Sequence, residues 1–155
     1  MTLDVLLLQR VANWRPDSTR SPLVVDHDAS GWRVQLSLRD ANPIGVQALA
    51  IEFQRLRPLL SAPPLDEQAR RLAQQVTGLL EPLQLIEMDA SNQVAQLRSN
   101  KPADDANGVR YYEMLRHADG TTRLQRYQAN GNRREAVEFT LTLDALGKLT
   151  RDVTN

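Results

Sequence analysis

The chain contains no cysteine among its 155 residues. Disulfide bridges, thiolate metal sites and thiol catalysis are therefore excluded, and the composition fits a reducing compartment. Lysine is almost absent as well, since Lys101 and Lys148 are the only two, and nearly all basic residues are arginine. Basic and acidic residues balance at 19 each. A balanced chain does not have the net basic charge that a general polyanion-binding protein needs.

Long apolar runs are also missing. The run Val5 to Leu8 near the N-terminus has no basic leader before it. It is far shorter than the roughly 20 residues of a membrane span or the apolar core of a secretory signal. We therefore expect a cytoplasmic protein that is not inserted in a membrane.

The motifs of the commonest enzyme classes are absent too. The sequence has no GxGxxG, GxxxxGK[ST], GxSxG or HExxH pattern. Each of these patterns marks a phosphate, dinucleotide, nucleophile or zinc site. No serine or carboxylate is placed by the sequence to complete a relay with His117. The sequence thus favours a protein without catalytic activity and without a cofactor.

What is present is hydrophobic periodicity, which predicts an α+β fold within a single domain, residues 1–155. Alternation of apolar and polar residues predicts strands over 23–27, 32–39, 83–89 and 93–99. Spacings of three and four predict a main helix over 64–81 and a short closing helix over 143–151. We expect a curved, mainly antiparallel sheet of about six to eight strands, with the main helix packed on one face and short helices at the termini.

Two segments fit more than one structure, and a third is predicted to be a loop. Residues 2–13 fit an amphipathic helix or an edge strand, and we favour the helix. Residues 46–56 fit a strand or a helix, and the β-branched Ile51 favours the strand. Residues 100–108 give the strongest loop signal of the chain, so we interpret Asp104 and Asp105 as solvated loop residues.

Two dipeptides, Asp119-Gly120 and Asn130-Gly131, predict two tight hairpins in series. Both are favoured in two-residue loops with positive φ. If both loops have two residues, Leu124 lies opposite both Leu115 and Val137, and this face forms part of the core. The opposite, wetter face then gathers the candidate binding residues Tyr112, Met114, Arg116, Arg123, Tyr127 and Arg134. Tyrosine, methionine and arginine are enriched where proteins meet partners.

One segment resembles a cluster of metal ligands. Asp26 and Asp28 flank His27, and on a strand the two carboxylates share a face. A carboxylate pair can contribute to a magnesium site, but the sequence offers no third ligand. We therefore interpret these residues as the end of a strand and the start of the turn that reaches Gly31.

The leading functional hypothesis is a non-catalytic binding or protein-interaction domain, including self-association as a homodimer. The alternative is a small-ligand-binding protein or an enzyme with a pocket between sheet and helix. Its polar anchors would be the Asp26–Asp28 segment or the Arg116 and Arg123 pair.

Nucleic-acid binding is the third hypothesis. It would use five arginines, namely Arg110, Arg116, Arg123, Arg133 and Arg134. Three glutamates interleave with them, namely Glu113, Glu135 and Glu138. Because these acids would repel phosphates, nucleic acid is the least favoured partner.

Overall fold

The computed structural model describes the whole chain except residues 20, 100–102 and 106–107. Its helices are α1 (Leu3–Asn13), α2 (Leu65–Gln75) and α3 (Leu143–Thr154). Its strands are β1 (Leu23–His27), β2 (Trp32–Ala41), β3 (Gly45–Arg55), β4 (Leu83–Asp89), β5 (Val94–Ser99), β6 (Ala103–Asp105), β7 (Gly108–His117), β8 (Thr122–Asn130), β9 (Arg133–Val137) and β10 (Phe139–Thr142).

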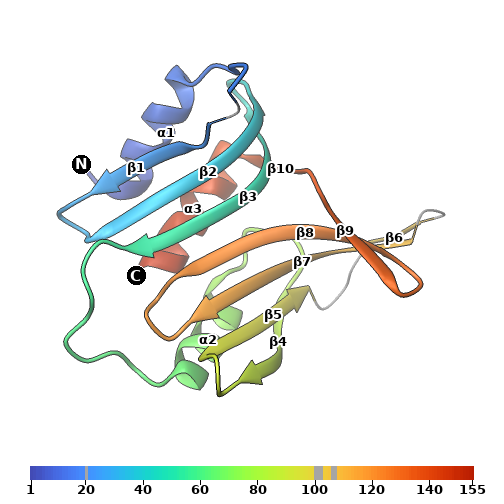
Figure 1. Cartoon of the computed structure of the whole chain (residues 1–155). Coiled ribbons are helices and arrows are strands. Elements are labelled where there is room, and N and C mark those ends of the chain that lie inside the picture. The colour runs from blue at the N-terminus through green and yellow to red at the C-terminus, as the bar shows by residue number, and fades with distance from the viewer. Residues whose placement is uncertain (20, 100–102, 106–107) are drawn as a thin grey trace.

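The strands form one curved, unclosed sheet, and every pairing among the described residues is antiparallel (Figure 1). The strand order is β1-β2-β3-β8-β7-β5-β4, while β10 pairs with β3, β6 with β7 and β9 with β8. The α+β class is confirmed. The ten strands in the described part of the chain exceed the expected six to eight because residues 103–105 and 139–142 add short strands.

All three helices lie on one side of the sheet (Figure 1). Helix α1 contacts β1, β2 and α3, helix α3 contacts β3 and β10, and helix α2 contacts β4, β5 and β7. Fully buried side chains such as Trp32, Phe53, Leu7, Met114 and Leu146 fill the space between these layers. We call the helix-covered side of the sheet the inner face and the other side the outer face.

Most of the predicted elements are confirmed. The segment 2–13 is a helix, α1, and the segment 46–56 is a strand as far as Arg55, as favoured. The closing helix is present and runs three residues beyond Arg151. The loop predicted over 100–108 is wrong in part, because residues 103–105 pair with β7 as strand β6. The remaining part of that segment includes residues outside the described part of the chain.

The main helix is shorter than predicted and is not longer than the other two. It ends at Gln75 instead of residue 81, and Val76 already has an extended backbone. Val76, Thr77 and Gly78 are three successive weak helix formers, which outweigh the apolar pattern that continues beyond them. Leu79 is still buried, but Leu80 has a positive φ and points into solvent.

The register predicted for the first C-terminal hairpin is wrong by one residue. The loop has three residues, 118–120, because the N–H of His117 donates to the carbonyl of Thr121. Gly120 takes the position with positive φ, at +96°. A three-residue loop with glycine in that position is the next most common hairpin connection after the two-residue loop. Leu124 consequently lies opposite Met114 instead of Leu115.

The second hairpin is shifted by two residues. Asn130 pairs with Arg133, so the two-residue loop consists of Gly131 and Asn132 instead of Asn130 and Gly131. Val137 therefore lies opposite Arg126 instead of Leu124. A shift of two keeps each side chain on its face, whereas a shift of one exchanges the faces. The error in the first hairpin is thus the one that redistributes the candidate residues.

Candidate functional site: an arginine-lined pocket

The six residues predicted to share a binding face lie on opposite faces of the sheet. Three are on the inner face: Tyr112, Met114 and Arg116. Three are on the outer face: Arg123, Tyr127 and Arg134. Tyr112 is 6% exposed and Met114 is fully buried, so neither is accessible to a partner in this fold. The single surface built from these six residues is therefore wrong.

The outer-face arginines have acidic or aromatic partners in the fold itself. Arg134 stacks on Tyr127, with its Cζ 4.0 Å from the ring centroid, although Ala136 and not Arg134 lies directly opposite Tyr127. It also donates from Nη1 to Glu113 Oε2 at 2.6 Å and to the hydroxyl of Tyr111 at 3.2 Å. The hydrogen bond to Glu113 is the main reason that the pKa of Arg134 is raised. Arg123 likewise donates to Glu52 Oε2 at 2.9 Å.

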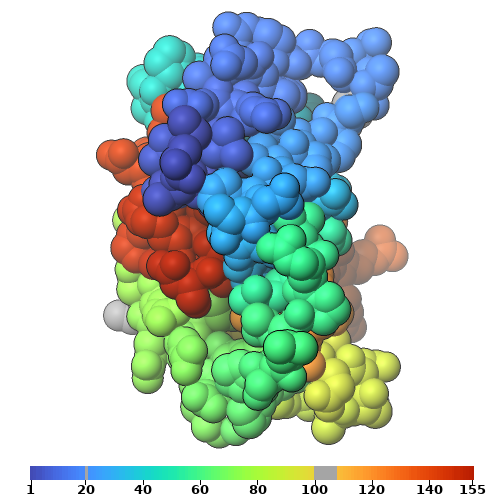
Figure 2. All heavy atoms as spheres, turned by 90° about the vertical axis from the view of Figure 1, so that its left-hand side faces the viewer, coloured from blue at the N-terminus to red at the C-terminus, as the bar shows by residue number. Residues whose placement is uncertain are grey.

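The inner-face Arg116 lies in a different environment. It lines a pocket of about 220 Å³ bounded by α2, the β7–β8 turn, the segment that follows β3 and the end of α3. Figure 2 shows the green segment after β3, the yellow-green α2 and the red α3 meeting on this side of the molecule. We call this cavity the Arg116 pocket.

Two neutral oxygen acceptors hold the guanidinium of Arg116 in place. Its Nε donates to Gln68 Oε1 at 2.9 Å, and its Nη1 donates to Thr122 Oγ1 at 3.0 Å. Both partners are buried and their own donors are used elsewhere. Gln68 Nε2 donates to backbone carbonyls at 2.8 and 3.2 Å, and the hydroxyl of Thr122 donates to a carbonyl at 2.9 Å. The acceptors are therefore fixed in the orientation that receives the arginine.

The charge of Arg116 has no carboxylate in contact among the residues that the structure describes. Burial, and next the nearby charge of Arg55, lower the pKa of Arg116 to about 10, and Asp119 opposes this only at longer range. The side chain is still protonated at neutral pH. A guanidinium has five N–H donors, and only two of them have an acceptor in the described part of the chain. The remaining donors are available to a ligand in the pocket.

Other charged groups at the pocket add to this positive character. Arg55 lines it and stacks over Trp32, with its Cζ 4.6 Å from the ring centroid. Arg71 lines it from α2 and pairs with Glu67 at 3.2 Å. Asp119 also lines the pocket, but its Oδ1 accepts the backbone N–H of Thr121 at 2.9 Å. That hydrogen bond is the largest cause of the lowered pKa of Asp119.

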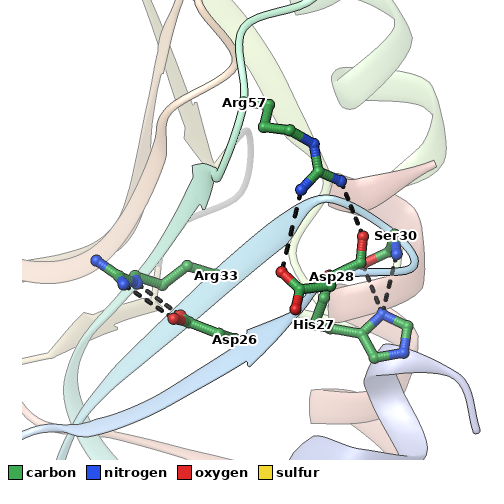
Figure 3. Close-up of polar contacts among 6 residues, drawn as sticks. All are labelled: Asp26, His27, Asp28, Ser30, Arg33 and Arg57. Carbon is green, nitrogen blue, oxygen red and sulfur yellow. Dashed lines mark hydrogen bonds and ion pairs between the residues drawn. The ribbon is translucent and has the colours of Figure 1, made fainter.

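The residues Asp26 to Asp28 do not line the Arg116 pocket and have polar partners of their own (Figure 3). Asp26 accepts two hydrogen bonds from Arg33, at 2.6 and 2.9 Å, and this partner is the first cause of its lowered pKa. Asp28 faces Arg57 at 4.0 Å. His27 contacts the hydroxyl of Ser30 at 2.8 Å and the carbonyl of Met1 at 2.9 Å.

Each carboxylate of this segment thus has an arginine beside it, which disfavours a cation there. Within the described ranges, no three or more histidine and acidic side chains come together as metal ligands would.

None of the helices described has the length and apolar character needed to cross a bilayer.

Sequence reasoning identified Arg116 but missed the residues that hold it. Gln68 carried a usable signal in the sequence, because it interrupts the apolar stripe of α2 between Leu65 and Leu72. In the structure its side chain is only 7% exposed. A polar side chain on a buried helix face normally has a hydrogen-bond partner. Its partner Arg116 is 48 residues away, and no local pattern connects the two.

Comparison of the chain with protein-family models, curated proteins and solved structures finds no match in any of the three. The chemistry of the pocket is therefore the basis for a proposal of function.

Proposed function

We propose that this chain is a non-catalytic binding protein whose ligand carries an anionic group that pairs with Arg116. One observation supports this most directly: the arginine is partly buried, held by two neutral acceptors and without a carboxylate in contact among the described residues. Withdrawing a charge from water is costly unless an opposite charge compensates it. A bound carboxylate or phosphate would supply that charge, and a guanidinium binds such planar or multi-oxygen anions through two donors at once.

The lining of the pocket supports binding rather than catalysis. Its polar side chains are arginines, amides and the turn-forming Asp119. General acid–base catalysis at neutral pH requires a group with a pKa near 7 within reach of the ligand. Arg116, with a pKa of about 10, remains a cation throughout the physiological range.

A binding experiment with simple anions tests the proposal. We expect propionate and phosphate to shift the amide resonances of Ala118 and Thr122 with saturation in the millimolar range, on the order of 1–10 mM. Arg116→Gln should abolish the shifts, while Arg71→Gln, at the rim and already paired with Glu67, should retain them. Saturable shifts that persist in a folded Arg116→Gln protein would overturn the assignment, as would their absence in the wild type.

Self-association through the outer face is the second candidate function. The three described helices lie on the other side of the sheet, and this face exposes Val24 beside polar side chains. Tyr127 and Arg123 lie on the same face. We propose it as the surface for a homodimer in the cytoplasm. Sedimentation of the wild type and of Val24→Ser with Tyr127→Ser should show a dimer converted into a monomer; a monomeric wild type contradicts it.

A further inference from the structure

The Arg116 pocket opens beside an exposed apolar segment. Residues 56–64 connect β3 to α2 without regular secondary structure. Leu59 in this segment lines the pocket and is 46% exposed, and the next residue, Leu60, is fully exposed. Figure 2 shows this green segment standing on the surface next to α2 and α3. Two adjacent leucines in solvent at the mouth of a charged pocket form a surface with both apolar and cationic character.

The interior of the pocket also has an apolar side and a cationic side. Ala62, Pro63 and Leu72 give it an apolar wall, while Arg116 and Arg55 lie toward the sheet. A ligand that satisfies both parts needs an anionic group next to an apolar one. Simple phosphate or sulfate would satisfy only the arginines.

The size of the pocket limits what enters it. Its volume of about 220 Å³ is smaller than the roughly 300–1,000 Å³ of sites for drug-sized ligands. An acidic side chain fits this volume, whereas a cofactor or nucleotide does not. The rest of a larger ligand would have to lie outside, where Leu59 and Leu60 are exposed.

The charges of the pocket also favour a ligand with an acidic group. Three arginines, Arg55, Arg71 and Arg116, line the pocket, and Asp119 is the one acidic side chain in the described lining. Arg71 shares its charge with Glu67, and the partner of Arg55 among the described residues is the ring of Trp32. The pocket is thus complementary to an acidic group and repels basic segments.

We propose that the partner is a peptide segment of another protein in which an acidic side chain is flanked by apolar residues. The carboxylate enters the pocket and pairs with Arg116, and the flanking apolar side chains pack on Leu59 and Leu60. This inference rests on the proposed anion-binding function and adds the nature of the molecule that carries the anion.

Three probes test the inference on the full chain by calorimetry. They are propionate, the capped peptide acetyl-Ala-Leu-Asp-Leu-Ala-amide, and the same capped peptide with asparagine in place of aspartate. We expect the aspartate peptide to bind at least about ten-fold more tightly than propionate, and the asparagine peptide to lose about ten-fold or more relative to the aspartate peptide. The variant Leu59→Ser with Leu60→Ser should reduce the affinity for the aspartate peptide to that for propionate. Leu60→Ser alone, which lies outside the pocket lining, should weaken peptide binding and leave propionate binding unchanged.

Different outcomes would reject the peptide partner and the anion site. If propionate and the aspartate peptide bind equally well, or the leucine substitutions leave peptide binding unchanged, the peptide partner is rejected and anion binding stands. If neither binds, or both bind the folded Arg116→Gln protein as they bind the wild type, the anion site itself is rejected. Because Leu59 and Leu60 are exposed, their substitution should not prevent folding, which the amide spectrum verifies.

Discussion

The charged side chains on the two faces of strand β7 have different partners. On the inner face, Met114 is fully buried in the core, and Arg116 lines a pocket in which none of the described carboxylates contacts it. On the outer face, Glu113 is only 4% exposed although no helix covers it, because Gln96 and Arg134 donate hydrogen bonds to it at 2.8 and 2.6 Å. On this strand the carboxylate on the solvent-facing side is paired within the fold, whereas Arg116 on the helix-covered side has no carboxylate in contact among the described residues.

This contrast distinguishes an arginine that is paired within the fold from the one that we propose to bind a ligand. The paired Arg134 has a raised pKa, because the charged form gains a hydrogen bond from Glu113. The pKa of Arg116 is lowered, because burial and Arg55 disfavour its charged form. Where a fold retains a cation that its own residues do not neutralise, a ligand is the natural source of the missing charge.

The largest expected effect concerns which of two neighbouring residues is in the core. Met114→Ala should lower the free energy of unfolding by about 2–5 kcal/mol, because it opens a cavity opposite Leu124. Leu115→Ala, on the half-exposed outer face, should cost less than about 1 kcal/mol. Urea denaturation of both variants measures the difference. Similar losses, or a larger loss for Leu115, would support the two-residue loop and contradict the observed register.

Much of the fold follows from local pattern alone. The alternation of Trp32, Val34 and Leu36 with polar residues predicted β2 correctly, because each of these side chains is buried on one face. The loop lengths could not be derived in the same way. Asp119-Gly120 is compatible with a two-residue or a three-residue loop, and packing of Met114 against Leu124 and Ile51 decides between them.

The candidate site depends even more on distant contacts. Arg116 was among the predicted binding residues, but on a face with Tyr112 and Tyr127 that the fold does not form. Its actual neighbours, Gln68 and Arg55, come from segments that are far away in sequence. Periodicity reports which face a residue occupies, whereas a site requires knowledge of which segments meet.

The second prediction tests the paired side of the contrast. Glu113→Ala leaves the donors of Gln96 and Arg134 without their acceptor, so we expect a loss of about 1–3 kcal/mol in the free energy of unfolding. The exposed Glu135 on β9 is the control, and Glu135→Ala should change stability by less than about 0.5 kcal/mol. Equal and small effects would mean that the outer-face pairing contributes no stability.

The two hairpin loops allow a smaller test. Gly131 has φ of +64°, within the left-handed region that asparagine tolerates, whereas Gly120 has φ of +96°, outside it. Alanine should cost about 1 kcal/mol at residue 131 and more at residue 120. Gly131→Asn should recover most of that loss and Gly120→Asn should not. Thermal unfolding compares the four variants, and recovery at residue 120 would contradict the observed loop geometry.

The smallest effect is the pH dependence of anion binding. Propionate is ionised at neutral and basic pH, so only the protein changes its charge when the pH rises. The folded-state pKa of Arg116 is depressed, and binding requires the protonated form. Affinity should therefore be constant from neutral pH to about pH 9 and weaken about two-fold at pH 10, where half of the side chain is deprotonated. An arginine with an ordinary pKa would lose no measurable affinity there. Constant affinity through pH 10, in protein that circular dichroism shows to be folded, would mean that the arginine paired with the anion does not have a depressed pKa.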